Sequence, residues 1–168
     1  MTASWRKSSA VAALLVAACC AVPAAAATTT AAVAASVNKP LVISRVADLS
    51  FGTILLSAAT NFTASVSIGQ NGVFTCPATL TCTGATSPAT YNVQGSKQSP
   101  VQINVPPSMT LTGPYGTITM TTSAPSSLVL ANSGFPGTDF NIGGTLTLTN
   151  ATPDGLYTGT FAVTADYQ

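Results

Sequence analysis

The sequence predicts an all-β protein built as an antiparallel sandwich, and three features of its 168 residues support this. Short runs of alternating polar and apolar residues recur, most clearly GTITMTT at residues 116–122 and GTLTLTN at residues 144–150. Beyond residue 27, helix formers such as Glu, Lys and Arg are scarce, whereas Thr, Val, Ser, Gly and Pro dominate. Gly, Pro and Asn separate the runs at short intervals, a spacing typical of sandwiches and barrels.

Each of these two runs alternates Thr with a larger apolar residue, so one strand face is expected in the core and the other in water. Asn71 and Gly72 predict a tight hairpin turn between two strands. The final run, residues 157–168, alternates up to the last residue. The remaining strands are predicted at residues 41–46, 49–55, 62–68, 73–76, 90–93, 101–105 and 128–130.

The first 27 residues have the pattern of a signal peptide, which is removed during export. Arg6 and Lys7 supply the positive charge, and residues 10–22 form an apolar run too short to span a bilayer as a helix. The small residues 24–27 suit signal peptidase, so cleavage is expected after Ala26 or Ala27. The protein is therefore expected to pass through the periplasm to the cell surface.

A second interpretation of this region is a lipoprotein signal. Residues 16–19 also fit a lipobox, which would leave a lipidated Cys19. The small-residue site at 24–27 is favoured because it lies in better register with the end of the apolar run.

Export also bears on the cysteines, because an oxidising compartment favours disulfides. Removal of the signal peptide leaves one pair, Cys76 and Cys82, and we expect these two to be bonded. Zinc is the alternative for two nearby cysteines, but the chain has no His and no further Cys pair to complete four ligands.

The charged residues exclude several classes of function. Beyond residue 27 there are three basic and four acidic residues, a net charge of 3 − 4 = −1, and no basic cluster that would attract nucleic acid. The chain has no His and no Glu, so acid–base catalysis would depend on scattered Asp residues. Asp154 lies between Pro153 and Gly155, which is turn chemistry. We expect neither an enzyme nor a bound cofactor.

We predict a single domain over residues 39–168. Residues 28–38, which precede it, differ from it in composition. The segment TTTAAVAASVN is uncharged and lacks turn residues, so it is interpreted as an N-terminal extension. Val33, Ala35 and Val37 form an alternating apolar stripe along it. It is either a flexible linker or a strand that inserts into the groove of another protein.

The C-terminus is the most informative segment, because the chain ends within a strand that still has one apolar face. Phe161, Val163, Ala165 and Tyr167 occupy alternate positions. Chaperone–usher pilins end in such a strand, with a penultimate Tyr and a Gly at the fourteenth position from the end. The chain resembles them here, because Tyr167 is penultimate and Gly155 is fourteenth (168 − 155 + 1 = 14).

A second resemblance lies near the start of the domain. KPLVISRVADLSFGTIL, residues 39–55, resembles the opening strands of archaic, spore-coat-U-like pilins, with Leu49, Phe51 and Gly52 in an L-x-F-G pattern. It is also similar to a family of small secreted β-sandwich domains with no assigned function. That family shares this opening and the closing pattern Y-T-G-T-F-x-V-T-x-x-Y.

The resemblance implies an immunoglobulin-like sandwich that lacks its last strand and is completed by a strand from a partner. A periplasmic chaperone lends a strand, and the N-terminal extension of the next subunit later replaces it. The implied function is a structural subunit of a surface fibre, with the chaperone, an outer-membrane usher and identical or related subunits as partners. The implied donor residues are Val33, Ala35 and Val37, and the implied acceptor and chaperone-binding residues are Gly155, Phe161, Val163, Ala165 and Tyr167. The alternative is a self-complete secreted or surface-anchored sandwich that acts as an adhesive or ligand-binding module.

Overall fold

The computed structural model of the chain describes residues 26–58 and 61–168. It divides into two units, Met1–Ala35 and Ser36–Gln168. In the first unit, residues 26–35 are exposed and belong to no strand. The predictions that concern residues 1–25, including the signal-peptide core and Cys19, lie outside the described residues.

The second unit is all-β, which confirms the predicted fold class, and the described residues contain no helix. No helix of the length and hydrophobicity needed to span a membrane occurs in this part of the chain. The strands are β1 (Val42–Ala47), β2 (Thr53–Leu55), β3 (Thr63–Ile68), β4 (Phe74–Thr75), β5 (Thr81–Thr83), β6 (Ala89–Gln94), β7 (Pro100–Asn104), β8 (Ser108–Gly113), β9 (Gly116–Ser123), β10 (Ser127–Val129), β11 (Thr138–Thr149) and β12 (Thr164–Tyr167).

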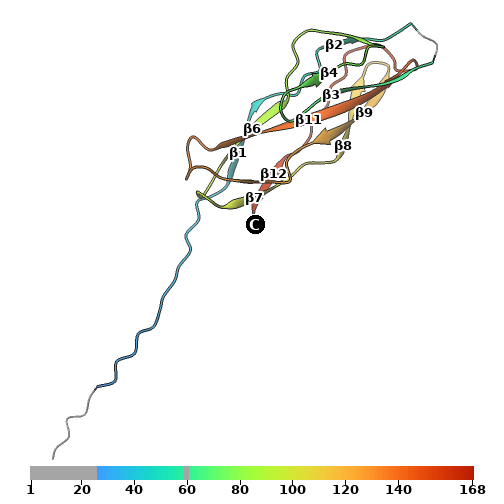
Figure 1. Ribbon diagram of the computed structural model, residues 1–168. Coiled ribbons are helices and arrows are strands. Elements are labelled where there is room, and N and C mark those ends of the chain that lie inside the picture. The colour runs from blue at the N-terminus through green and yellow to red at the C-terminus, as the bar shows by residue number, and fades with distance from the viewer. Residues whose placement is uncertain (1–25, 59–60) are drawn as a thin grey trace, which may run out of the picture. The chain divides into compact units, whose positions relative to one another are not determined.

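These strands form two main sheets and one short pair (Figure 1). The larger sheet has the order β1-β6-β11-β3-β4, with β9 and β8 joined to it through β11. The smaller sheet has the order β10-β7-β12, and β2 pairs with β5. One core cluster lies between β6, the first half of β11 and the smaller sheet, and its fully buried members include Val93, Val101 and Ile142. The domain is therefore an antiparallel sandwich at this end.

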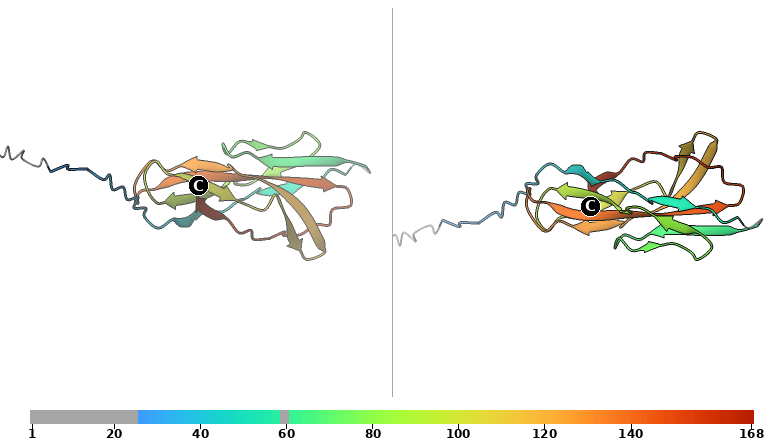
Figure 2. Two further views of the ribbon diagram at one scale, coloured as in Figure 1. Left: turned by 90° about the horizontal axis from the view of Figure 1, so that it is seen from below. Right: turned by 90° about the horizontal axis from the view of Figure 1, so that it is seen from above.

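β11 joins this first core to a second one. Its first half, from Thr138 to Ile142, pairs with β6, and the half from Gly144 to Thr149 pairs with β3. Its residues 143–146 also pair with β9. The second core cluster covers the inner faces of β3, β9 and β11, and consists of Ala64, Val66, Leu80, Met120, Leu146 and Leu148. The β8–β9 hairpin bends away from the other strands over this half (Figure 2).

The outer face of the same strands is lined with hydroxyl side chains, which confirms the predicted alternation. Thr121 of β9 pairs with Ser108 of β8 and with Thr145 of β11, and Thr145 in turn pairs with Ser67 of β3. Ser67 pairs with Thr75 of β4, so one row of Ser and Thr crosses all five strands. The larger apolar residues between them point into the second core, so one face of these strands lies toward solvent and the other lies in the core.

Several predicted elements differ from the structure. The strand predicted at residues 49–55 is regular only over β2, β11 begins six residues before the predicted run at 144–150, and β5 was not predicted. The predicted turn at Asn71 and Gly72 is present, but the connection from β3 to β4 spans residues 69–73. The predicted strand at residues 157–168 is regular only over Thr164–Tyr167, because β12 pairs only where β7 lies opposite it. β8 was not among the predicted strands, since Pro106 and Pro107 directly before it signalled only the end of the preceding run.

A glycine pair at the point where β11 changes partners provides a test of this fold. A Cβ atom at Gly143 would lie 2.1 Å from the backbone oxygen of Ile68, so this site has no room for a side chain. We expect Gly143→Ala to lower the free energy of unfolding by about 3 kcal/mol, the upper end of the range for overpacked cores. Thr147→Ser, on the exposed face of the same strand, should cost less than about 1 kcal/mol. Urea unfolding measures both values, and equal costs for the two variants would contradict this packing.

Candidate functional site

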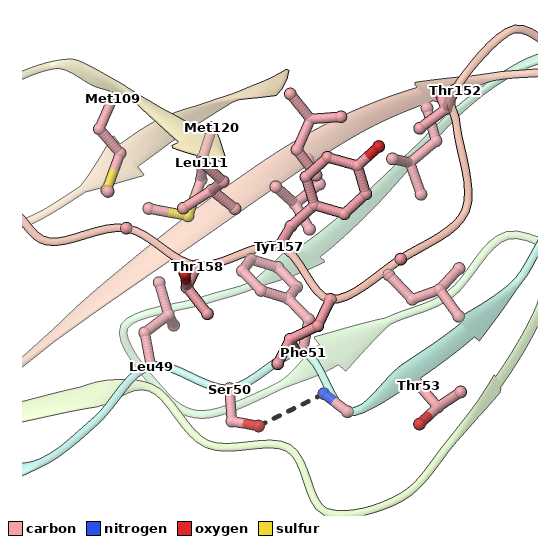
Figure 3. Close-up of a pocket in the computed structure, with 18 of the residues that line it drawn as sticks. Leu49, Ser50, Phe51, Thr53, Met109, Leu111, Met120, Thr152, Tyr157 and Thr158 are labelled. Carbon is pink, nitrogen blue, oxygen red and sulfur yellow. Dashed lines mark hydrogen bonds between the residues drawn. The ribbon is translucent and has the colours of Figure 1, made fainter. Parts of the chain in front are cut away.

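An open apolar groove lies in the second unit, between residues 48–56 and residues 150–161 (Figure 3). Its volume is about 1260 Å³. The floor is the inner face of β8, β9 and β11, where Met120, Leu146 and Leu148 are buried and the side chains of Met109, Leu111 and Ile118 are half-buried. The apolar side chains of the floor are Met109, Leu111, Ile118, Met120, Leu146 and Leu148.

The first wall follows directly from the L-x-F-G motif. Leu49 and Phe51 are two residues apart, and both side chains line the groove (Figure 3). Gly52 has a positive φ of 67°, and a Cβ atom there would lie 2.5 Å from the carbonyl oxygen of Thr83. Only glycine can make this close left-handed turn without strain. It turns the chain from the groove wall into β2.

The second wall is the segment that precedes β12. Gly155 has a φ of 139° and packs on Pro114, because a Cβ atom there would lie 2.6 Å from the proline ring. The Tyr157 hydroxyl donates a hydrogen bond of 2.7 Å to the carbonyl oxygen of Pro153. The Tyr157 ring lies against Gly113, where an added Cβ would be 2.7 Å from it. These contacts fix the wall to the tip of the β8–β9 hairpin.

Only one backbone bridge ties this wall to β8. The amide of Thr112 donates to the oxygen of Thr158 at 2.8 Å, and the amide of Thr158 donates back at 3.0 Å. Residues 159–163 lie between this bridge and β12 and belong to no strand. The peptide backbone along the groove is therefore not part of a continuous ladder, and such an edge is a template for a further strand.

Two segments that line the groove are continuous with edge strands. β1 is the edge of the larger sheet, and residues 48–56 continue from it. β12 is the edge of the smaller sheet, and residues 150–161 lead into it. The groove thus lies beside the segment that leaves β1 and the segment that enters β12.

The chemistry of the groove is dominated by apolar surface. Its charged lining residues are Arg45, Asp48 and Asp154. Arg45 and Asp48 form an exposed ion pair, with 2.5 Å between Nη1 and Oδ1. Burial raises the pKa of the Tyr91 hydroxyl; the Arg45 charge lowers it by a smaller amount, and the Asp48 charge adds to the rise. Within the described residues, no three His, Cys, Asp or Glu side chains lie close enough to hold a metal ion. The groove therefore offers apolar burial and backbone hydrogen bonds.

The five predicted acceptor residues occupy two places. Gly155 and Phe161 line the groove, and the Phe161 ring also lies 6.5 Å from the Tyr91 ring. Val163, Ala165 and Tyr167 instead pack against the first core cluster. The side chains at positions 161, 163, 165 and 167 are half-buried, and those at the positions between them are exposed, so the predicted alternation is present.

The three predicted donor residues are on the surface. Val33 and Val37 are 94% and 91% exposed, the highest values among the large apolar side chains described. Ala35 is exposed as well, and residues 26–41 form no strand. The extension therefore carries apolar side chains with nothing in the described chain burying them.

The predicted disulfide is present. Cys76 and Cys82 are bonded, with 6.2 Å between their Cα atoms. Both half-cystines pack against the second core cluster, and Leu80 between them is 7% exposed. The loop was expected on the surface, but it also covers part of the core because Leu80 points inward.

The groove floor was not identified from the sequence. The strand at residues 116–122 was predicted to bury one face, and Ile118 and Met120 lie on that face. Periodicity shows that a face is apolar, but it does not show whether another element covers it. The signal that could have found the floor is the imbalance between many apolar strand faces and few covering elements.

Comparisons with known proteins identify a domain family. A family described as a domain of unknown function, DUF4402, matches residues 41–167, which is most of the chain. No curated protein and no solved structure matches this chain.

The disulfide gives a stability test that is independent of the groove's role. We expect the double variant Cys76→Ala/Cys82→Ala to lose about 2 kcal/mol of unfolding free energy, because closing so short a loop removes little unfolded-state entropy. Chemical denaturation measures the loss, and the wild-type protein should fall to the same value in reductant. Two freely alkylated thiols in the unreduced wild-type protein would contradict the bond.

Proposed function

This chain belongs to the DUF4402 family, and we propose that it is a structural subunit of a bacterial surface fibre assembled by donor-strand exchange. One observation carries the proposal: a groove with an apolar floor, walled by segments that continue into edge strands, occurs in the same chain as an exposed, alternating apolar extension. Each of these features is an aggregation hazard by itself. The groove and the extension are complementary, because the apolar side of an extended strand can cover an apolar floor.

The extension has the chemistry that the groove requires. Residues 28–38 carry no charged side chain, and the groove floor is apolar. In extended form the segment spans about 36 Å, which exceeds the length of any single floor strand except β11. Val33, Ala35 and Val37 point to one side of such a strand, so all three can face the floor while the backbone pairs with the groove wall.

The occupant is proposed to come from a second copy of the chain. To enter its own groove, the extension would have to reverse at residues 38–41, where hydrogen bonds hold Lys39 and the Pro40 ring fixes φ. It would then run parallel to the C-terminal segment, since that segment also runs toward Lys39. A strand from another copy can enter in the antiparallel sense, which pairs slightly better.

The proposed assembly needs protection for the open groove before exchange. A periplasmic chaperone would occupy the groove with its own strand, and an outer-membrane usher would present it to the next subunit. The signal peptide proposed at residues 1–27 would bring the chain to these partners. In this account the chain contributes apolar burial and strand pairing rather than catalysis.

A second candidate function uses the same groove. A volume of about 1260 Å³ with an apolar floor would also suit an apolar ligand in a self-complete secreted or surface-anchored module. In that case residues 28–38 would be a tether only. Expression of residues 37–168 alone separates the two: a soluble monomer that melts cooperatively without any added strand favours the module.

The proposal is tested with the extension removed and then returned as a peptide. Deletion of residues 28–36 should abolish fibre formation in cells that supply the chaperone, while the chaperone-bound domain is still recovered. A synthetic peptide of residues 28–38 should then raise the melting temperature of the truncated domain. At 100 times its Kd, the peptide adds about 2.7 kcal/mol of stability.

A matched peptide controls for sequence. The same peptide with Val33→Asp and Val37→Asp places charges against the apolar floor and should give no stabilisation. Fibres formed by the truncated chain, or equal stabilisation by the two peptides, would refute the donor assignment.

A further inference from the structure

The Tyr167 hydroxyl lies at the root of the N-terminal extension. It donates a hydrogen bond of 2.8 Å to the carbonyl oxygen of Lys39. It also accepts a hydrogen bond of 2.7 Å from the backbone amide of Ser96. One side-chain oxygen thus joins the penultimate residue of the chain to the residue at which the extension meets the domain, 128 positions earlier.

A second set of contacts holds the same residue. The Lys39 amide donates to the Ser96 hydroxyl at 2.7 Å, and Lys39 Nζ donates to the carbonyl oxygen of Ser133 at 3.4 Å. The root is therefore fixed by two backbone atoms and one side-chain atom. These contacts reach β12, the segment after β6, and the loop between β10 and β11.

The slot for the hydroxyl depends on a glycine. A Cβ atom at Gly95 would lie 2.3 Å from the Tyr167 hydroxyl oxygen and 2.9 Å from Leu41 Cδ1. Gly95 precedes Ser96, so the missing side chain allows the hydroxyl to reach the Ser96 amide. The Tyr167 ring packs against the first core cluster, which fixes the direction in which the hydroxyl points.

We propose that Tyr167 is a positioning residue whose hydroxyl latches the root of the extension to β12. This deepens the proposed function, because it gives Tyr167 a role in presenting the donor segment in addition to its place on the acceptor strand. β12 continues the second wall of the groove, and β1 continues into the first wall. The latch thus connects the outgoing donor directly to the strand beside the incoming one.

Two consequences follow from this connection. A fixed root limits the directions in which residues 28–38 leave the domain, which reduces the entropy lost when they enter a neighbouring groove. Tension on the extension is also shared between β1 and β12. Without the hydroxyl, β12 would no longer share this tension. The tension would then act on β1, an edge strand that pairs only with β6 in the described chain, and on the Lys39 contacts with Ser96 and Ser133.

The test is Tyr167→Phe in the full exported chain, because this change removes the hydroxyl and keeps the ring in the core. The Ser96 amide loses its acceptor, so its hydrogen exchange should accelerate by about tenfold, as expected for the loss of one hydrogen bond. The Lys39 amide, which donates to the Ser96 hydroxyl, should exchange faster as well because the root loosens. Amides in the second core, such as those of Val66 and Leu146, should be unchanged. Fibre yield should fall several-fold in cells that supply the chaperone.

The matched control is Tyr115→Phe, which removes a hydroxyl from a side chain that is 73% exposed. This variant should change neither the exchange rates nor the fibre yield.

Different outcomes test the latch, its role in presenting the donor and the proposed function separately. Unchanged exchange at Lys39 and Ser96 would overturn the latch, and equal acceleration at Val66 and Leu146 would show a general stabilising role instead. Local acceleration with unchanged fibre yield would overturn its role in presenting the donor. If the wild-type chain forms no fibre at all, the proposed function fails, while the exchange data still decide whether the hydroxyl fixes the root.

Discussion

The rest of the structure depends on one packing constraint: the smaller sheet is too short to cover the larger one. β10, β7 and β12 close the first core, but β8, β9 and the second half of β11 extend beyond them. β2, β5 and the disulfide loop cover one side of this remaining inner face. The other side is the floor of the groove, where Met109, Leu111 and Ile118 are only half-buried. Exposed apolar surface of this extent costs free energy in water, so an additional strand would stabilise the domain.

Three glycines determine the path of the two groove walls. Gly52 turns the first wall into β2, and Gly155 turns the second wall on Pro114. Gly159 lies so close to β8 that a Cβ atom there would meet Met109 Cε at 2.7 Å, which holds the backbone of this wall near the floor. The low content of charged residues, 5% of the chain, agrees with the proposal that this surface is covered in an assembly, because weakly charged proteins gain little solubility from electrostatics.

Much of the fold could be predicted from the sequence because strand periodicity is a local property. The alternating runs at residues 116–122 and 144–150 lie in β9 and β11, with Thr outward and Ile, Met or Leu inward. The disulfide was also predictable, because only Cys76 and Cys82 remain once the first 27 residues are set aside as a predicted signal peptide. The C-terminal strand was predicted too long, since alternation continues through residues 157–163 although, among them, only Thr158 forms a bridge with the neighbouring strand β8.

The groove and the Tyr167 contacts could not be predicted in the same way, because both depend on long-range placement. Leu111 and Leu146 look alike in sequence and both line the groove floor, yet Leu111 is half-buried and Leu146 is only 4% exposed. The partners of Tyr167 are Lys39 and Ser96, which are distant along the chain. The C-terminal resemblance singled out Gly155 and Tyr167, and these residues lie at the groove wall and at the root of the extension.

The central claim is that the extension of one copy fills the groove of another, and photo-crosslinking tests it most directly. The full chain would carry a diazirine side chain in place of Val33, and the assembled protein would be irradiated and analysed by mass spectrometry. The account predicts covalent links between two copies, attached to residues 48–56, 109–120 or 150–161. Links within one copy, or attachment between copies at β7 or β10, would contradict it.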